Sequence, residues 1–196
     1  MSASPDCAGG AALPRAAALI VIDVQNAIDA PYWGRRNNPD AERNMAALLA
    51  AWRAGRRPLY HVRHDSTFED SAYRPGQPGN DFKPAVQPLP GEPVVAKRTN
   101  SAFIGTDLEQ RLREAGHTTL VVAGVSTSNS VEATVRMAGN LGFATYVVSD
   151  ATFTFDKRDL SGRLFPAEDV HALAPANMHG EYATVVDTAW VLARVG

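Results

Sequence analysis

The chain has 196 residues, of which 45% are hydrophobic and 20% are charged, a balance typical of one globular α/β domain with a sizeable core. The formal net charge is −2, and no run of Lys and Arg occurs, so we expect neither nucleic acid nor an anionic membrane as a partner. The single cysteine excludes an internal disulfide, and the longest apolar run, 16–22, is too short to span a bilayer; with no secretory signal, a cytoplasmic protein is predicted.

Six β-rich runs follow one another along the chain, and the central ones are almost continuously apolar, as expected for parallel strands covered on both faces. The runs are 18–24, 58–64, 93–98, 118–124, 143–150 and 183–188. Helical patterns between them cover 38–55, 106–116, 128–142 and 166–180. Pro175 is expected to kink or end the last helix. This alternation predicts a three-layer α/β fold with a doubly wound, mostly parallel, six-stranded, Rossmann-like sheet.

The chain is predicted to hold one domain over residues 16–196, preceded by a flexible tail over residues 1–15, because no repeat or linker follows that tail. Cys7 lies in the tail with no base or lysine fixed near it, and we interpret it as an incidental thiol.

Segment 65–92 is rich in Pro and Gly and has no clear period. Its aromatic residues Phe68, Tyr73 and Phe82 provide apolar anchors, so we expect an ordered loop there instead of a disordered insertion. Three loops are expected to line a ligand pocket, namely 26–37, 65–92 and 152–165.

Polar side chains follow three of the predicted strands at the edge where doubly wound sheets bind ligands. Asp23 follows the first strand, Lys97 ends the 93–98 strand, and Ser130 lies just after the 118–124 strand and its glycine turn. Each has a plain structural explanation, since such a carboxylate can cap a helix, such a lysine is usually solvated, and a serine in a first helical turn can satisfy backbone donors. Their joint placement predicts a functional site.

Four segments carry a resemblance to a known family: "ALIVIDVQNA", "VVAKRTNSAFIGTDLEQRLREAG", "GVSTSNSVEATVRMAGNLGF" and "VVSDATFTFD". In that order they resemble the isochorismatase-like cysteine hydrolases, which include nicotinamidases and N-carbamoylsarcosine amidohydrolases. The resemblance covers about residues 16–190, nearly all of the chain. It implies the isochorismatase-like hydrolase fold and hydrolysis of a C–N bond in a small amide, carbamoyl or lactam substrate.

The resemblance also implies site residues. The family uses an aspartate, a lysine and a cysteine, and by motif position these are Asp23 as general base and acid, Lys97 as support for the thiolate, and position 130 as nucleophile. The family pattern G-V-x-T-x-x-C-V matches residues 124–131, except that Ser130 stands where the cysteine would be. A cis peptide bond between Val125 and Ser126 is implied, with an oxyanion hole made by the backbone N–H groups of Ser126 and Ser130.

Three interpretations of Ser130 remain open. In the first, the chain is an inactive Cys-to-Ser form of a cysteine hydrolase; we favour it because an aspartate is poorly matched to activate an alcohol, which ionises several pKa units less readily than a thiol. In the second, Lys97 is the base of a Ser-Lys enzyme. In the third, position 130 is no nucleophile, and Asp23 hydrolyses a vinyl ether as in true isochorismatases. A non-catalytic small-molecule-binding protein is a further alternative.

Six side chains near the predicted strand ends are candidates for substrate binding: Asn26, Trp33, His64, Phe103, Thr127 and Phe153. No metal is expected, because no carboxylate precedes His61 or His64 at the spacing that metal-binding relatives use, and the two rings should point to opposite faces of a strand. No cofactor is expected either. The resemblance implies assembly into a homodimer or homotetramer.

Overall fold

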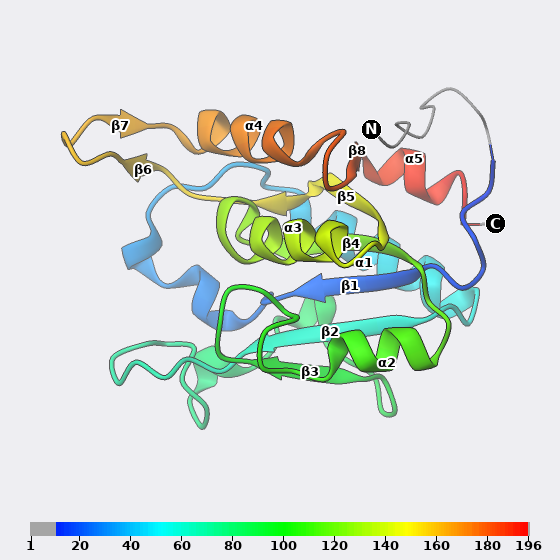
Figure 1. The fold of residues 1–196 in the computed structure, drawn as a ribbon. Helices are drawn as coiled ribbons and strands as arrows, with labels where there is room; N and C mark the ends of the chain where they lie inside the picture. Colours follow the sequence, from blue (N-terminus) through cyan, green and yellow to red (C-terminus); the bar gives the residue numbers. More distant parts are fainter. Residues whose placement is uncertain (1–10, 196) are drawn as a thin grey trace.

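The computed structural model describes residues 11–195, so Cys7 and most of the predicted tail lie outside the described residues. Its centre is a sheet of six strands, all parallel, in the order β3-β2-β1-β4-β5-β8 (Figure 1). The strands are β1 (Ala18–Ile22), β2 (Leu59–His64), β3 (Val94–Lys97), β4 (Thr119–Val125), β5 (Ala144–Phe153) and β8 (Thr184–Val186). The predicted doubly wound six-stranded sheet is confirmed.

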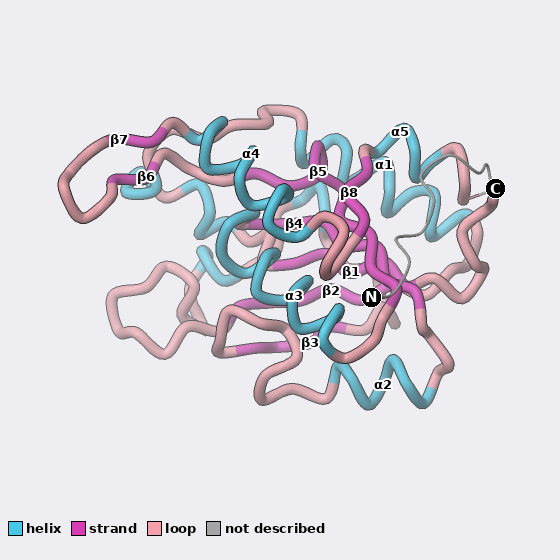
Figure 2. The backbone as a smooth tube through the Cα atoms, turned by 45° about the horizontal axis from the view of Figure 1, so that its top comes forward, coloured by secondary structure: helices cyan, strands magenta, loops and turns pink. Residues whose placement is uncertain are grey.

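Helices cover both faces of the sheet (Figure 2). They are α1 (Ala41–Ala54), α2 (Leu108–Glu114), α3 (Glu132–Asn140), α4 (Ala167–Met178) and α5 (Thr188–Leu192). Alternate residues of β1 point to opposite faces, so Leu19 and Val21 pack in one core with α1 and α5, whereas Ile20 and Ile22 pack in the other with α2, α3 and α4. The near-continuous apolar runs of the sequence follow from this two-sided burial.

Short elements connect the layers at the carboxyl edge of the sheet. Four are 3₁₀ helices: η1 (Asn26–Asp29), η2 (Pro31–Trp33), η3 (Pro78–Asn80) and η4 (Pro84–Val86). A π-helical turn, η5 (Thr127–Val131), joins β4 to α3. An antiparallel hairpin of β6 (Lys157–Arg158) and β7 (Leu164–Phe165) projects beyond α4 (Figure 1). The sequence did not predict this hairpin, because strands of two residues carry no period.

Two local expectations are corrected. The predicted tail is ordered at its end, because Leu13 is buried and its N–H donates to the Arg194 carbonyl at 2.9 Å. Pro175 does not end α4, which continues to Met178. A proline in the last turn removes only one intrahelical hydrogen bond, and the helix stops within a turn of it. None of the described helices is long and apolar enough to cross a membrane.

The segment that connects β2 to β3 is ordered through side-chain hydrogen bonds. The amide of Asn80 donates to the Tyr73 carbonyl at 2.8 Å, and the amide of Gln25 donates to the Asn80 carbonyl at 2.9 Å. Tyr73 is buried and anchors the loop as expected. Phe68 does not, because 78% of its surface is exposed.

Gly124 sets the spacing between the two central strands. It has φ 127°, and a Cβ built there would overlap the backbone oxygen and nitrogen of Ile22 on β1. Only glycine lets β4 lie against β1 at this point, immediately before the turn that carries Ser130.

We expect Gly124→Ala to lower the free energy of unfolding by about 3 kcal/mol or more, because it adds a backbone clash to an unfavourable φ. Gly142→Ala is the matched control, since Gly142 also has a positive φ, 83°, but open space around its Cβ position. That variant should lose only about 1–2 kcal/mol. Urea unfolding of both variants measures the difference, and equal losses would contradict the close-approach explanation.

Candidate active site

Asp23, Lys97 and Ser130 come together at the carboxyl edge of the sheet. The Lys97 ammonium donates to Asp23 Oδ2 at 2.6 Å and to Ser130 Oγ at 3.4 Å. All three are buried, with exposed fractions of 4%, 1% and 8% in chain order. Lys97 lies on β3, two strands from β1, so its side chain crosses the end of β2 to reach Asp23. The structure therefore assembles the three residues that the sequence singled out.

The backbone at Asp23 turns sharply out of β1. Asp23 has φ 55°, in the left-handed region that Asp tolerates better than most residues. Its carbonyl accepts from the Gln25 N–H at 2.9 Å, which closes a tight turn. This turn leaves the carboxyl group at the strand end, where Lys97 can reach it.

The electrostatics of the trio follow from burial. Removal from water raises the pKa of the Asp23 carboxyl, and the ammonium of Lys97 opposes this rise. Burial and the Lys97 charge lower the pKa of His64, so its ring is neutral at pH 7 and its Nδ1 can accept from Lys97 at 3.4 Å. Asp23 Oδ1 has no hydrogen-bond partner among residues 11–195. Its lone pairs are therefore available to accept a proton within the trio.

Ser130 is held by the π-helical turn η5. The peptide bond between Val125 and Ser126 is cis, as the resemblance implied. The Val131 N–H donates to the Ser126 carbonyl at 3.2 Å, the five-residue spacing of a π-turn, a type of turn often found at functional sites. The hydroxyl of Thr127 bonds His171 Nδ1 of α4 at 3.0 Å, which fixes the turn from behind.

A cavity of about 400 Å³ opens above the trio. Asp23, Ser126 and Ser130 line it together with Trp33 and His64, two of the predicted substrate-binding residues. This volume suits a small molecule.

The other four predicted substrate-binding residues do not line the cavity. Phe103 and Phe153 are buried in the core, where Phe103 stacks on Phe143. Thr127 turns toward His171, and the Asn26 amide donates to the Pro78 carbonyl at 3.0 Å on the protein surface. Each follows a strand end in sequence, but the local backbone directs its side chain elsewhere.

Several lining residues were not predicted from the sequence as ligand contacts: Tyr32, Ser66, Asp70, Tyr73, Asn100 and Asn129. Some lie in the loops 26–37 and 65–92, which were expected to line the pocket, but no period or motif marks which loop residue points inward. The segment 152–165, also expected there, contributes no residue to this cavity; part of it lines a separate groove against α4.

His61 and His64 lie in different environments. His61 is fully buried, and its Nε2 lies 2.9 Å from a Glu92 carboxylate oxygen, whereas His64 faces the cavity. Within the described part of the chain, no group of three or more His, Cys, Asp or Glu side chains is arranged to hold a metal ion.

Ion pairs hold the segment that carries Tyr32 and Trp33, two aromatic residues of η2 that line the cavity. Lys83 bonds Asp29 at the end of η1 and Glu42 of α1, and Glu42 also pairs with Arg36. Burial of the Glu42 carboxyl would raise its pKa, but the hydrogen bonds from Arg36 and Lys83 outweigh burial and lower the pKa to about 2. The segment that carries Trp33 is therefore fixed on both sides.

Comparison with known proteins shows what the chain as a whole is similar to. The family model described as "Isochorismatase domain" matches residues 17–189 of the chain. A crystal structure of an isochorismatase-family protein from Chromobacterium violaceum ATCC 12472 has a TM-score of 0.90 and 56% identity, covering 100% of this chain and 99% of that one. The isochorismatase family protein YrdC of Bacillus subtilis (strain 168) is 40% identical over 171 residues, 87% of this chain and 91% of that protein. Ureidoacrylate amidohydrolase RutB of Methylobacterium radiotolerans is 29% identical, covering 93% of this chain and 81% of that protein.

Removing the amine of Lys97 should expose the cost of burying Asp23. We expect Lys97→Met to lose about 3–5 kcal/mol of unfolding free energy near pH 7, because the carboxylate is left buried without its counter-ion. Burial alone then acts on Asp23 and keeps its folded pKa above the unfolded value, so the loss should shrink as the pH falls toward about 4.

Two controls accompany this measurement by urea unfolding. Lys83→Met breaks a less buried pair and should cost about 1 kcal/mol. Adding Asp23→Asn to Lys97→Met should recover part of the loss. If the double variant were less stable than Lys97→Met at pH 7, the buried-charge explanation would be wrong.

Proposed function

The chain belongs to the isochorismatase family of hydrolases, and from this we propose that it is built to hydrolyse a C–N bond in a small amide, carbamoyl or lactam substrate. We propose further that Ser130 occupies the nucleophile position and that serine in place of cysteine leaves the chain with little turnover. The observation that carries the proposal is the buried contact of Lys97 with both Asp23 and Ser130. The amidohydrolase activity named for the relative RutB supports the same bond type.

The proposed chemistry assigns one task to each residue. With a thiol at position 130, Asp23 Oδ1 takes the thiol proton, and the Lys97 ammonium stabilises the thiolate. The thiolate attacks the carbonyl carbon, and the N–H groups of residues 126 and 130 stabilise the oxyanion. Asp23 returns the proton to the leaving amine, and water hydrolyses the thioester.

Serine fits this arrangement poorly. The hydroxyl must lose a proton several pKa units less acidic than that of a thiol, and the base offered is a carboxylate. Lys97 is an unsuitable base in this arrangement, because its ammonium already donates to Asp23 Oδ2 at 2.6 Å and to the Thr99 carbonyl at 3.0 Å. In each of these contacts the amine is the donor, as it is toward Ser130 Oγ, and this geometry supports the interpretation of Ser130 as a replaced cysteine over a Ser-Lys enzyme.

The cavity lining also argues against vinyl-ether hydrolysis of isochorismate. That substrate carries two carboxylates, which enzymes usually bind through Arg or Lys. No Arg or Lys lines the cavity within the described part of the chain, and the lining includes the carboxylates of Asp23 and Asp70. An uncharged amide group meets no such obstacle.

We expect Ser130→Cys to raise kcat/KM for ammonia or amine release from small amides by on the order of 100-fold or more, because a thiolate forms where an alkoxide does not. Adding Asp23→Asn should abolish the gain. Ser128→Cys is the matched control: it places a thiol on the same turn, but Ser128 does not line the cavity, so no gain is expected.

The same assays separate the alternatives. No gain across amides, carbamoyl compounds and lactams would contradict the proposed function. Pyruvate release from isochorismate, insensitive to position 130 but lost in Asp23→Asn, would establish vinyl-ether hydrolysis instead. Tight binding without turnover in both the Ser130 chain and its Ser130→Cys variant would establish a binding protein.

A further inference from the structure

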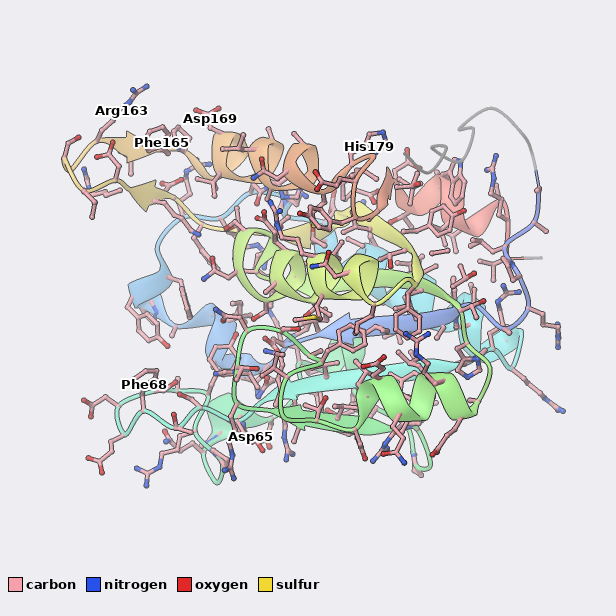
Figure 3. The ribbon with its side chains drawn as sticks, in the orientation of Figure 1. Asp65, Phe68, Arg163, Phe165, Asp169 and His179 are labelled. Carbon is pink, nitrogen blue, oxygen red and sulfur yellow. The ribbon has the colours of Figure 1, made fainter. Side chains whose placement is uncertain are left out.

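The mouth of the cavity is flanked by aromatic rings that the folded chain leaves uncovered. Tyr32 and Phe68 both line the cavity, yet their exposed fractions are 64% and 78%. They come from different segments, Tyr32 from η2 and Phe68 from the loop after β2, which extends away from the sheet (Figure 3). Large apolar side chains exposed at a pocket mouth are typical of ligand contacts.

An unpaired carboxylate accompanies these rings. Asp70 lies two residues from Phe68 and lines the same cavity. Within residues 11–195, its carboxylate makes no ion pair or side-chain hydrogen bond, in contrast to Asp65 nearby, which pairs with Arg63 at 2.9 Å. The structure therefore places at the mouth a carboxylate that forms no ion pair with the described part of the chain.

The rest of the lining does not offset this charge. The described lining residues include no Arg or Lys, and the His64 ring is neutral at pH 7 because burial and Lys97 lower its pKa. Two cations contact lining residues without lining the cavity themselves: Lys97 is 1% exposed and bound to Asp23, and the Lys157 ammonium donates to Asn129 Oδ1 at 2.7 Å. The charged side chains of the lining itself are therefore Asp23, which pairs with Lys97, and Asp70, which forms no ion pair within residues 11–195.

We propose that the substrate carries a cationic group, an ammonium or a guanidinium, that binds Asp70 and the faces of Tyr32 and Phe68 while its C–N bond lies at Asp23 and Ser130. Aromatic faces attract cations through their quadrupole, and a carboxylate beside them adds a charge-assisted hydrogen bond. A neutral ligand would use the rings but would desolvate Asp70 without compensation, and an anionic ligand would be repelled. This inference rests on the proposed function and names the substrate class of the same site.

Direct binding to the Ser130 chain tests the proposal without requiring turnover. The probes are linear amides of matched length that differ only at the far end: 5-aminopentanamide, hexanamide and glutaramate, with the same three types in shorter and longer chains. Isothermal titration calorimetry at low salt should show the cationic member of the best-fitting length binding about tenfold more tightly than its neutral partner, with no binding by the anionic member. The preference should decrease as salt is added.

Variants assign the preference to its residues. Asp70→Asn should remove most of the tenfold preference and leave the affinity for the neutral amide within about twofold. Glu69→Gln is the matched control, because Glu69 is the neighbouring exposed carboxylate and does not line the cavity; it should retain the preference. Phe68→Leu, which keeps an apolar side chain but removes the ring, should lower the preference by about threefold.

Three outcomes would overturn the inference: equal affinity for cationic and neutral amides, a cation preference that survives in Asp70→Asn, or no binding by any cationic member. Its failure is distinguishable from failure of the proposed function. If the Ser130→Cys variant turned over amides without a charge preference, only this inference would be wrong. If cationic amides bound in an Asp70-dependent way but the Ser130→Cys variant showed no turnover, only the proposed reaction would be wrong.

Discussion

The candidate site depends on one buried ion pair, between the Lys97 ammonium and the Asp23 carboxylate. Two charges removed from water at this depth are costly unless each compensates the other, and the 2.6 Å contact supplies that compensation. The pair also links β3 to β1 across the end of β2, so the edge strand and the central strand must keep their register for the charges to meet. The same ammonium contacts Ser130 Oγ and His64 Nδ1. The floor of the cavity, which we define as Asp23, Lys97 and Ser130, is therefore arranged around this single amine.

The turn that presents Ser130 is determined by the backbone as much as by side chains. Gly124 allows β4 to approach Ile22 of β1, and the π-helical turn then directs residue 130 back over the strand ends toward Asp23 and Lys97. These features do not depend on which nucleophile stands at position 130. Under the proposal that Ser130 replaces a cysteine, the two residues would differ in the acidity of the side chain and not in the shape of the site.

The floor and the mouth of the cavity have different physical characters. At the floor, a cation and a carboxylate neutralise each other in a buried environment, which suits the transfer of a proton to and from a small polar bond. At the mouth, exposed rings and the unpaired Asp70 face water, and this region has the chemistry to select what enters. Under the proposed function, position 130 governs cleavage of the bond, and the loops select the molecule that carries it.

The sequence by itself determined the layers, the order of the elements and the identity of the floor residues. Burial on both faces made the strands apolar throughout, and polar residues at three strand ends had to meet at one edge of a parallel sheet. Only the tertiary structure decided the direction of side chains that lie off the regular elements. Phe103 turned into the core, Phe68 was left exposed, and Asp70 was placed at the mouth without an ion pair to any residue within 11–195. Loops have no period that fixes which residue points inward, because their conformation is set by contacts with segments distant in sequence, such as those of Gln25 and Asn80.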